Sequence, residues 1–271
     1  MSLAAAHDTV CGIEIGGTWM RASLVESGTH RILDSRKVPT PSHPAQAILE
    51  LQRLWSGAGA PERFGFASAA ELKSGTVTRW PSQPSFVGSN LLAAFPGARP
   101  VCLDDASAAA FGEHNRSSQA ECGSSIYICV GTGVGGGLVL GGKLWAGHHG
   151  TAMDVGHIAV PSAALTRCTC GSQGCVQAIA SGRVLGGQQG RESRLALAAQ
   201  GLSELMLQLT RVLDCPLFIL GGGVFDGEPS LVDEVTRRAR DLGVMAEFAR
   251  GVLGSFAGSI GVAEFAGAGK Q

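Results

Sequence analysis

Three glycine runs, each directly after a short apolar segment, constrain the fold of this chain more than any other feature. They are Gly16-Gly17 followed by Thr18, the run from Gly131 to Gly137, and Gly221-Gly222-Gly223. The apolar segments before them have the length and composition of buried strands. Glycine lets backbone N–H groups approach phosphate oxygens closely, and a threonine hydroxyl adds a donor. One such run alone favours a tight turn, but three in one chain predict nucleotide binding.

The order strand, glycine turn, strand occurs twice, and this weak repeat indicates two related α/β lobes with a cleft between them. We expect a small lobe over residues 1–105 and a large lobe over 106–257, with a C-terminal helix at about 258–271 that can pack on the small lobe. Residues 68–88 are rich in Ser, Pro and Gly and predict a loop. The spacing of the glycines fits neither a Rossmann fingerprint nor a P-loop.

Composition narrows the class of protein. The 271 residues carry a net charge of −1 and are 45% apolar, which predicts a globular chain with no long-range attraction to nucleic acid or to a membrane. Residues 1–8 lack the basic start and apolar stretch of a signal peptide, and whether Met1-Ser2-Leu3 is an expression scar stays open. We therefore expect a cytoplasmic protein whose eight cysteines are reduced or bind metal.

One histidine and three closely spaced cysteines form the sharpest local signal. His157 is followed by Cys168, Cys170 and Cys175, which lie within eight residues. A Cys₃His set fills the four positions of a tetrahedral structural zinc and leaves none open for catalysis. The sequence therefore predicts a zinc-bound loop over residues 157–175.

Carboxylates stand at two places where phosphoryl transfer could use them. Glu14 lies on the strand before the first glycine turn, where it would hold Mg²⁺ through water or simply be an exposed strand residue. Asp104 and Asp105 end a strand before a helix-forming segment, and a carboxylate near the acceptor hydroxyl suits phosphoryl transfer. Asp105 is the candidate base. Taken alone, however, an aspartate before a helix more often serves as the N-cap residue.

These motifs together resemble the ROK family (repressor, open reading frame, kinase), bacterial sugar kinases with an α/β, two-lobed actin-like ATPase (ribonuclease H-like) fold. The resemblance covers residues 10–266, and its most specific strings are 131–137, Gly156-His157 and 168–175. It implies ATP, Mg²⁺ and a structural Zn²⁺ as cofactors and a sugar as substrate. No helix-turn-helix pattern precedes Val10, which disfavours the DNA-binding branch, and a homodimer stays open.

The resemblance also implies a role for each matching position. Asp105 matches the base that takes the proton of the sugar hydroxyl, and His157 matches a zinc ligand beside the sugar. The positions that match sugar contacts are Asp104, Asp154, His157 and Gln177. The positions that match nucleotide contacts are Glu14, Gly16, Gly17, Thr18, Thr132, Gly133, Gly221, Gly222 and Gly223.

Three sugar-contact positions depart from the family pattern. Asp104 stands where the family has Asn, Asp154 where it has Glu, and Gln177 where it has Glu. Sites that hydrogen-bond a substrate reject one that leaves their groups unpaired, so the substrate need not be glucose, and an amino or otherwise modified sugar is a fair expectation. The alternatives are a sugar or nucleotide sensor that has lost turnover, and an ATPase of the same fold, which has no use for the Cys₃His loop.

Overall fold

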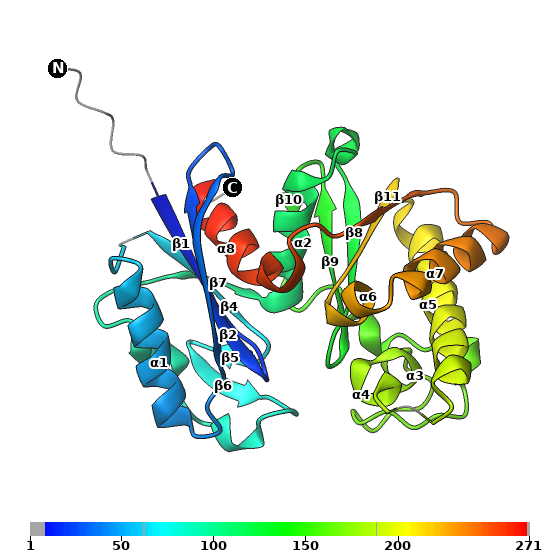
Figure 1. Cartoon of the computed structure of the whole chain (residues 1–271), viewed down its shortest axis with the longest axis horizontal. Helices are drawn as coiled ribbons and strands as arrows, with labels where there is room; N and C mark the ends of the chain where they lie inside the picture. The colour runs from blue at the N-terminus through cyan, green and yellow to red at the C-terminus, as the bar shows by residue number, and fades with distance from the viewer. Residues whose placement is uncertain (1–8, 62, 188, 270–271) are drawn as a thin grey trace. The chain divides into compact units, whose positions relative to one another are not determined.

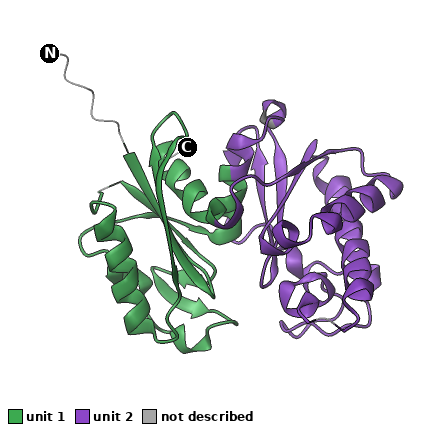
Figure 2. Ribbon diagram, in the orientation of Figure 1, with its two compact units in different colours: residues 1–112, 256–271 green, residues 113–255 purple. Residues whose placement is uncertain are grey.

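The computed structural model describes residues 9–61, 63–187 and 189–269, and in this part the chain is α/β. The predictions about Met1, Ser2 and Leu3, and about a signal peptide in residues 1–8, lie outside the described residues. The chain divides into two compact units at Gly112/Glu113 and at Ser255/Phe256 (Figure 2). The first unit is made of the two ends of the sequence and the second of its middle.

The first unit is a five-stranded sheet with the order β3-β2-β1-β4-β7 and a separate hairpin (Figure 1). Its strands are β1 (Thr9–Ile15), β2 (Trp19–Glu26), β3 (Ile32–Pro39), β4 (Phe64–Ser68), β5 (Glu71–Lys73), β6 (Thr76–Arg79) and β7 (Val101–Asp104). Its helices are α1 (Pro44–Gly57), the 3₁₀ turns η1 (Pro84–Phe86) and η2 (Leu91–Ala94), and α8 (Ala257–Gly267), while α2 (Asp105–Arg116) continues into the second unit.

The two faces of strand β1 differ because side chains alternate along a strand. Cys11, Ile13 and Ile15 are fully buried in the apolar core that also takes in residues of α1. On the other face, a Cβ atom added to Gly12 would lie 1.9 Å from the carbonyl oxygen of Ser259 in α8. Glycine here therefore lets α8 rest directly on the sheet (Figure 1). Glu14, on the same face, accepts a hydrogen bond from the N–H of Ser259 in this helix.

The prediction of a loop over residues 68–88 is wrong in part, because β5 and β6 form an antiparallel hairpin there. Val77 and Trp80 are almost fully buried in the core of the first unit. These two side chains are isolated among polar residues in the sequence, so no periodic pattern signals the strands. Contact with a core built elsewhere in the chain decides this hairpin.

The second unit repeats this sheet with the order β10-β9-β8-β11-β12. Its strands are β8 (Ser125–Val130), β9 (Val134–Leu140), β10 (Lys143–Leu144), β11 (Leu217–Gly221) and β12 (Glu247–Arg250). Its α-helices are α3 (Gln177–Ala180), α4 (Gly182–Leu185), α5 (Arg191–Leu213), α6 (Gly223–Gly227) and α7 (Pro229–Asp241). Its 3₁₀ turns are η3 (Ala120–Cys122), η4 (Val155–His157) and η5 (Pro161–Ala163), and η6 (Gly254–Phe256) ends it.

Both sheets begin with an antiparallel hairpin and add two parallel strands on its far side. The repeat expected from the sequence is thus present as one strand order used twice. Within the described residues, no helix is both long and apolar enough to span a bilayer.

Candidate active site

The first glycine turn joins β1 to β2 and is held by hydrogen bonds from two other segments. The N–H of Gly16 donates to the carbonyl of Trp19 (2.9 Å), and the hydroxyl of Thr40 donates to the carbonyl of Gly16 (2.7 Å). The side-chain amide of Gln83 donates to the carbonyl of Gly17 (2.8 Å). Because Thr18 is exposed at the tip, its N–H and hydroxyl are open to a ligand.

Glu14 is a buried ion-pair partner and not an exposed strand residue. Its Oε1 lies 2.8 Å from Nη1 of Arg21, and its Oε2 accepts from the N–H of Ser259 at 3.2 Å. Burial raises the pKa of Glu14 to about 7 although the Arg21 guanidinium opposes the shift, and the nearby Asp105 carboxylate adds to it. The exposed-strand alternative for Glu14 is therefore wrong.

Arg21 was missed by the sequence-based assignment, although a signal was present. Glu14 and Arg21 stand at equal distances from the Gly17/Thr18 peptide, and the register of the hairpin pairs them across β1 and β2. Opposite charges at directly paired positions stabilise an antiparallel ladder. A hairpin centred on this turn would have predicted the pair, whereas the contact with Ser259, from the other end of the chain, could not be predicted.

The candidate base and the first glycine turn lie at the same edge of the first sheet. Strands β1, β4 and β7 are parallel, and their register aligns Ile15 with Ser68 and Ser68 with Asp104. Gly16 and Asp105, each one residue further along, therefore follow strand ends at the same level. The carboxyl ends of parallel strands are where ligands bind in open α/β sheets.

Asp104, and not Asp105, caps helix α2. The Oδ1 of Asp104 accepts from the N–H of Ser107 at 2.8 Å, the bond by which a residue just before a helix satisfies a free backbone donor. The capping role considered for Asp105 is therefore filled by its neighbour. Asp105 is the first residue of the helix, and its half-buried carboxylate stays available for another role.

The environment of Asp105 shifts its pKa toward neutrality. Burial, followed by the adjacent Asp104 carboxylate, raises the pKa of Asp105 to about 6, while the N–H of Ala106 and the more distant Arg21 oppose the shift. A general base works best when its pKa lies near the working pH. The electrostatics of this carboxylate thus suit proton abstraction.

The second and third glycine turns lie together at one edge of the second sheet. The register of β8 and β11 pairs Cys129 with Gly221, so the turns at 131–133 and 221–223 follow aligned strand ends. A Cβ atom on Gly222 would lie 2.8 Å from the carbonyl oxygen of Val130, and its φ of 95° is accessible to glycine. Thr132 and Gly223 are exposed.

The sequence suggested a turn over the whole glycine run at 131–137, but only its first part is a turn. Strand β9 begins at Val134, so the turn itself is three residues long, and its ends are joined by the N–H of Gly131 and the carbonyl of Gly133 (2.9 Å). A Cβ atom on Gly136 would lie 2.9 Å from the carbonyl oxygen of Tyr127. Later glycines of the run thus serve close packing of the sheet.

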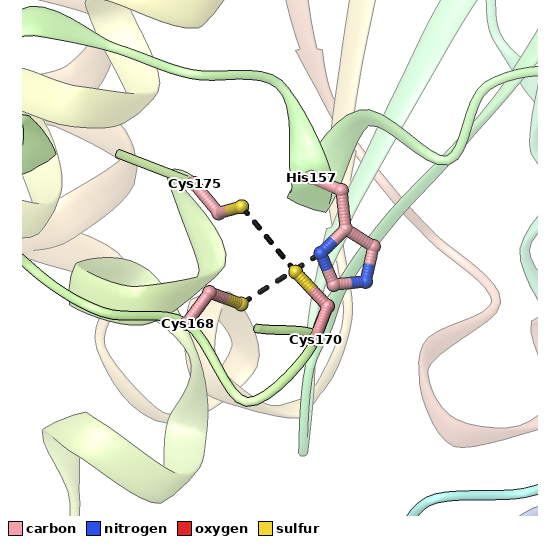
Figure 3. Close-up of side chains that lie close together, drawn as sticks. All are labelled: His157, Cys168, Cys170 and Cys175. Atoms are coloured by element: carbon pink, nitrogen blue, oxygen red, sulfur yellow. Dashed lines mark hydrogen bonds between the residues drawn. The ribbon is translucent and has the colours of Figure 1, made fainter. Parts of the chain in front are cut away.

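The structure brings together the four predicted metal ligands. The Nδ1 of His157 lies 3.7 Å from the sulfur of Cys168, the sulfurs of Cys170 and Cys175 lie 3.7 Å apart, and all four ligand atoms lie within 4.8 Å of one another (Figure 3). A tetrahedral zinc with Zn–S distances of about 2.3 Å places its ligand atoms roughly 3.8 Å apart. The donor set and its geometry fit a structural Zn²⁺.

The two ring nitrogens of the histidine in this cluster face different groups. Its Nδ1 faces the cysteines, and its Nε2 lies 4.0 Å from Oδ1 of the exposed Asp154. Met153, directly before Asp154, has a φ of 68°, which few non-glycine residues adopt.

Gln177, one of the predicted sugar contacts, accepts a backbone hydrogen bond through its side-chain oxygen. Its Oε1 accepts from the N–H of Val134 at 2.9 Å, directly after the second glycine turn. Among the described residues, the Gln177 amide nitrogen has no hydrogen-bond acceptor. The NH₂ group and the second lone pair of the oxygen are therefore left to meet a substrate.

The ROK family model matches residues 10–195. An N-acetylmannosamine kinase from Escherichia coli O6:H1 is 31% identical over 78% of this chain and 82% of its own length. A kanosamine kinase from Amycolatopsis mediterranei is 32% identical over 85% of this chain and 86% of its own length. A crystal structure of a ROK family glucokinase from Streptomyces griseus with glucose and AMPPNP is 28% identical, with a TM-score of 0.82 over 97% of this chain and 100% of the glucokinase.

The likeness to this structure confirms the expected actin-like α/β fold. It agrees with the doubled sheet, since one strand order occurs in both units.

Proposed function

The chain belongs to the ROK family, and on this premise we propose that it is an ATP-dependent sugar kinase with Asp105 as its general base. The sugar hydroxyl oxygen attacks the γ-phosphorus of ATP, a new P–O bond forms, and the bond to the ADP oxygen breaks. Asp105 accepts the hydroxyl proton. The observation that carries this assignment is the division of labour between the two aspartates, in which Asp104 caps the helix and Asp105 remains available with its pKa raised to about 6.

The nucleotide side of the site is assigned to the three glycine turns. Phosphoryl transfer depends on positioning and charge stabilisation, which converging N–H groups supply. The residues proposed to contact ATP are Gly16, Gly17, Thr18, Thr132, Gly133, Gly221, Gly222 and Gly223. Each oxygen of Glu14 already accepts one hydrogen bond, so Glu14 would hold Mg²⁺ through the water that this ion retains. A bound Mg²⁺ would neutralise phosphate charge.

The sugar side is assigned to Asp104, Asp154, His157 and Gln177. His157 can serve both roles because Nδ1 faces the cysteines while Nε2 faces Asp154. Zn²⁺, held by His157, Cys168, Cys170 and Cys175, would fix the loop that begins at His157 and ends two residues before Gln177. We place the reaction in the cytoplasm.

An amino or N-acylated sugar is the proposed substrate class. Asp104 and Asp154 keep negative charge at sugar positions, and relatives include kinases named for N-acetylmannosamine and for kanosamine. The test is ADP release with ATP, Mg²⁺ and a panel of glucose, N-acetylmannosamine, N-acetylglucosamine, glucosamine and kanosamine. A preference of at least tenfold in kcat/KM for a nitrogen-bearing sugar supports the class, and a preference for glucose contradicts it.

A sensor without turnover is the second candidate, and the engaged state of Glu14 favours it. Because Arg21 and Ser259 occupy both oxygens, the phosphate-side carboxylate is more restrained than a free Mg²⁺ ligand. Calorimetric binding of AMPPNP and of a sugar from the panel, without ADP release from ATP, would support the sensor and contradict the kinase.

The pH profile provides an independent check on Asp105. The base must be ionised, so kcat/KM is expected to rise with pH, with a midpoint near 6 set by the pKa of Asp105. Since the Asp104 carboxylate contributes to that raised pKa, Asp104→Asn is expected to move the midpoint to lower pH. Rates measured between pH 5 and 8 for both proteins test this. A rate that falls with pH through 6, or an unmoved midpoint, contradicts the assignment.

A further inference from the structure

The segment that follows the last cysteine of the metal cluster reaches back to the second glycine turn at two points. Gln177, two residues after Cys175, accepts from the N–H of Val134 at 2.9 Å through Oε1. Gly182, five residues later, donates its N–H to the carbonyl of Gly131 at 2.8 Å. Both limbs of the turn are therefore fastened to residues 177–182.

The space around these bonds admits no side chains. A Cβ atom on Gly133 would lie 2.6 Å from Oε1 of Gln177, and one on Gly156 would lie 3.3 Å from the same atom. A Cβ atom on Gly182 would lie 2.5 Å from the carbonyl oxygen of Gly131. Because Val134 supplies a donor, the Gln177 atom that meets it must be the amide oxygen. The side chain is thus held in one orientation.

The metal-binding loop sets where Gln177 begins. An isolated antiparallel β-bridge pairs the backbone of Cys175 with that of Ala159. The N–H of Val176 donates to the carbonyl of Ile158 at 3.0 Å. Cys175 is fixed in addition by its place in the Cys₃His cluster. Two residues of chain connect this anchor to the bond that holds Val134, so a displaced Cys175 would draw Gln177 away from the turn.

We propose that Gln177 is a positioning residue for the nucleotide, which links the metal-binding loop to the second glycine turn. This inference rests on the proposed function, in which that turn contacts the phosphates. It goes beyond the sugar-contact role implied by the resemblance, because the amide oxygen already accepts from the N–H of Val134 and loss of this bond would release one side of the turn. Nucleotide affinity, more than sugar affinity, therefore depends on this side chain.

Three substitutions test the proposal. Gln177→Met keeps the length and removes the acceptor, Gln177→Asn is one methylene too short to reach Val134, and Gln177→Glu keeps an acceptor oxygen. Leaving the buried N–H of Val134 unpaired is expected to raise the Kd of AMPPNP–Mg²⁺ about tenfold in the first two variants. The Glu variant should bind within about threefold of the unmodified protein, since its hydrogen bond is retained. Calorimetry without sugar measures these values.

The readouts separate the possible failures. Gln200→Met makes the same substitution on an exposed face of α5, where the Gln200 side chain donates to Glu204, and should leave the Kd unchanged. A raised sugar KM with an unchanged AMPPNP Kd in Gln177→Asn and Gln177→Met overturns the positioning role and returns Gln177 to the sugar. If Gln177→Met does not fold, Gln177→Asn decides alone. Failure of the unmodified protein to bind AMPPNP contradicts the proposed function itself.

Discussion

Asp105→Asn is expected to lower kcat by about 10²–10⁴, the range that removal of a general base gives. Asparagine has the same shape but cannot accept the proton of the sugar hydroxyl. The substitution at the start of α2 should cost little stability, because the cap of this helix is the Asp104 side chain. Sugar-dependent ADP release measures kcat, and calorimetry with AMPPNP verifies that the nucleotide still binds.

Asp104→Asn is the matched control for this prediction. It removes one negative charge next to Asp105 and keeps a good capping residue, so the helix start should persist. We expect it to change the sugar KM more than kcat, because Asp104 is assigned to the sugar. Equal losses of kcat in both variants, or full activity of Asp105→Asn, would show that Asp105 is not the base.

Loss of the zinc is expected to have the largest effect on stability. Cys170→Ser removes one of the four ligands, and because Cys170 is exposed, the change itself creates no cavity in the core. Structural zinc contributes directly to folding free energy, so the loss should be on the order of several kcal/mol and lower Tm by roughly 10 °C or more. Metal analysis should find about one zinc per chain in the unmodified protein and little in the variant.

Cys122→Ser is the control for replacing an exposed cysteine with serine. Cys122 is also exposed and lies in the second unit, but it is outside the Cys₃His cluster. This variant should keep its zinc and its Tm. A metal-free protein of full stability, or equal losses in the two variants, would refute the structural zinc site.

Much of this site could be predicted because its signals are local. Cys168, Cys170 and Cys175 lie within eight residues, and the glycine turns stand directly after apolar strands, so spacing alone brings their groups together. The same holds for the internal repeat, since the order strand, glycine turn, strand occurs twice in the sequence. Local spacing is enough here because residues that are close in the sequence can be brought together at a low cost in chain entropy.

The roles of individual polar atoms could not be predicted in this way. Two adjacent aspartates read alike in the sequence, and only the bond from Ser107 shows that Asp104 is the cap. The resemblance assigned Gln177 to the sugar, and only the structure shows that its oxygen accepts from the N–H of Val134, 43 positions away.

The sequence by itself determined the fold family, the grouping of His157 with Cys168, Cys170 and Cys175, and the glycine turns, because each is encoded in the spacing of neighbouring residues. The tertiary structure alone decided which oxygen of Glu14 meets Ser259, 245 positions later, and which aspartate stays available. Buried polar atoms must find partners wherever the folded chain supplies them, and that choice depends on contacts distant in sequence.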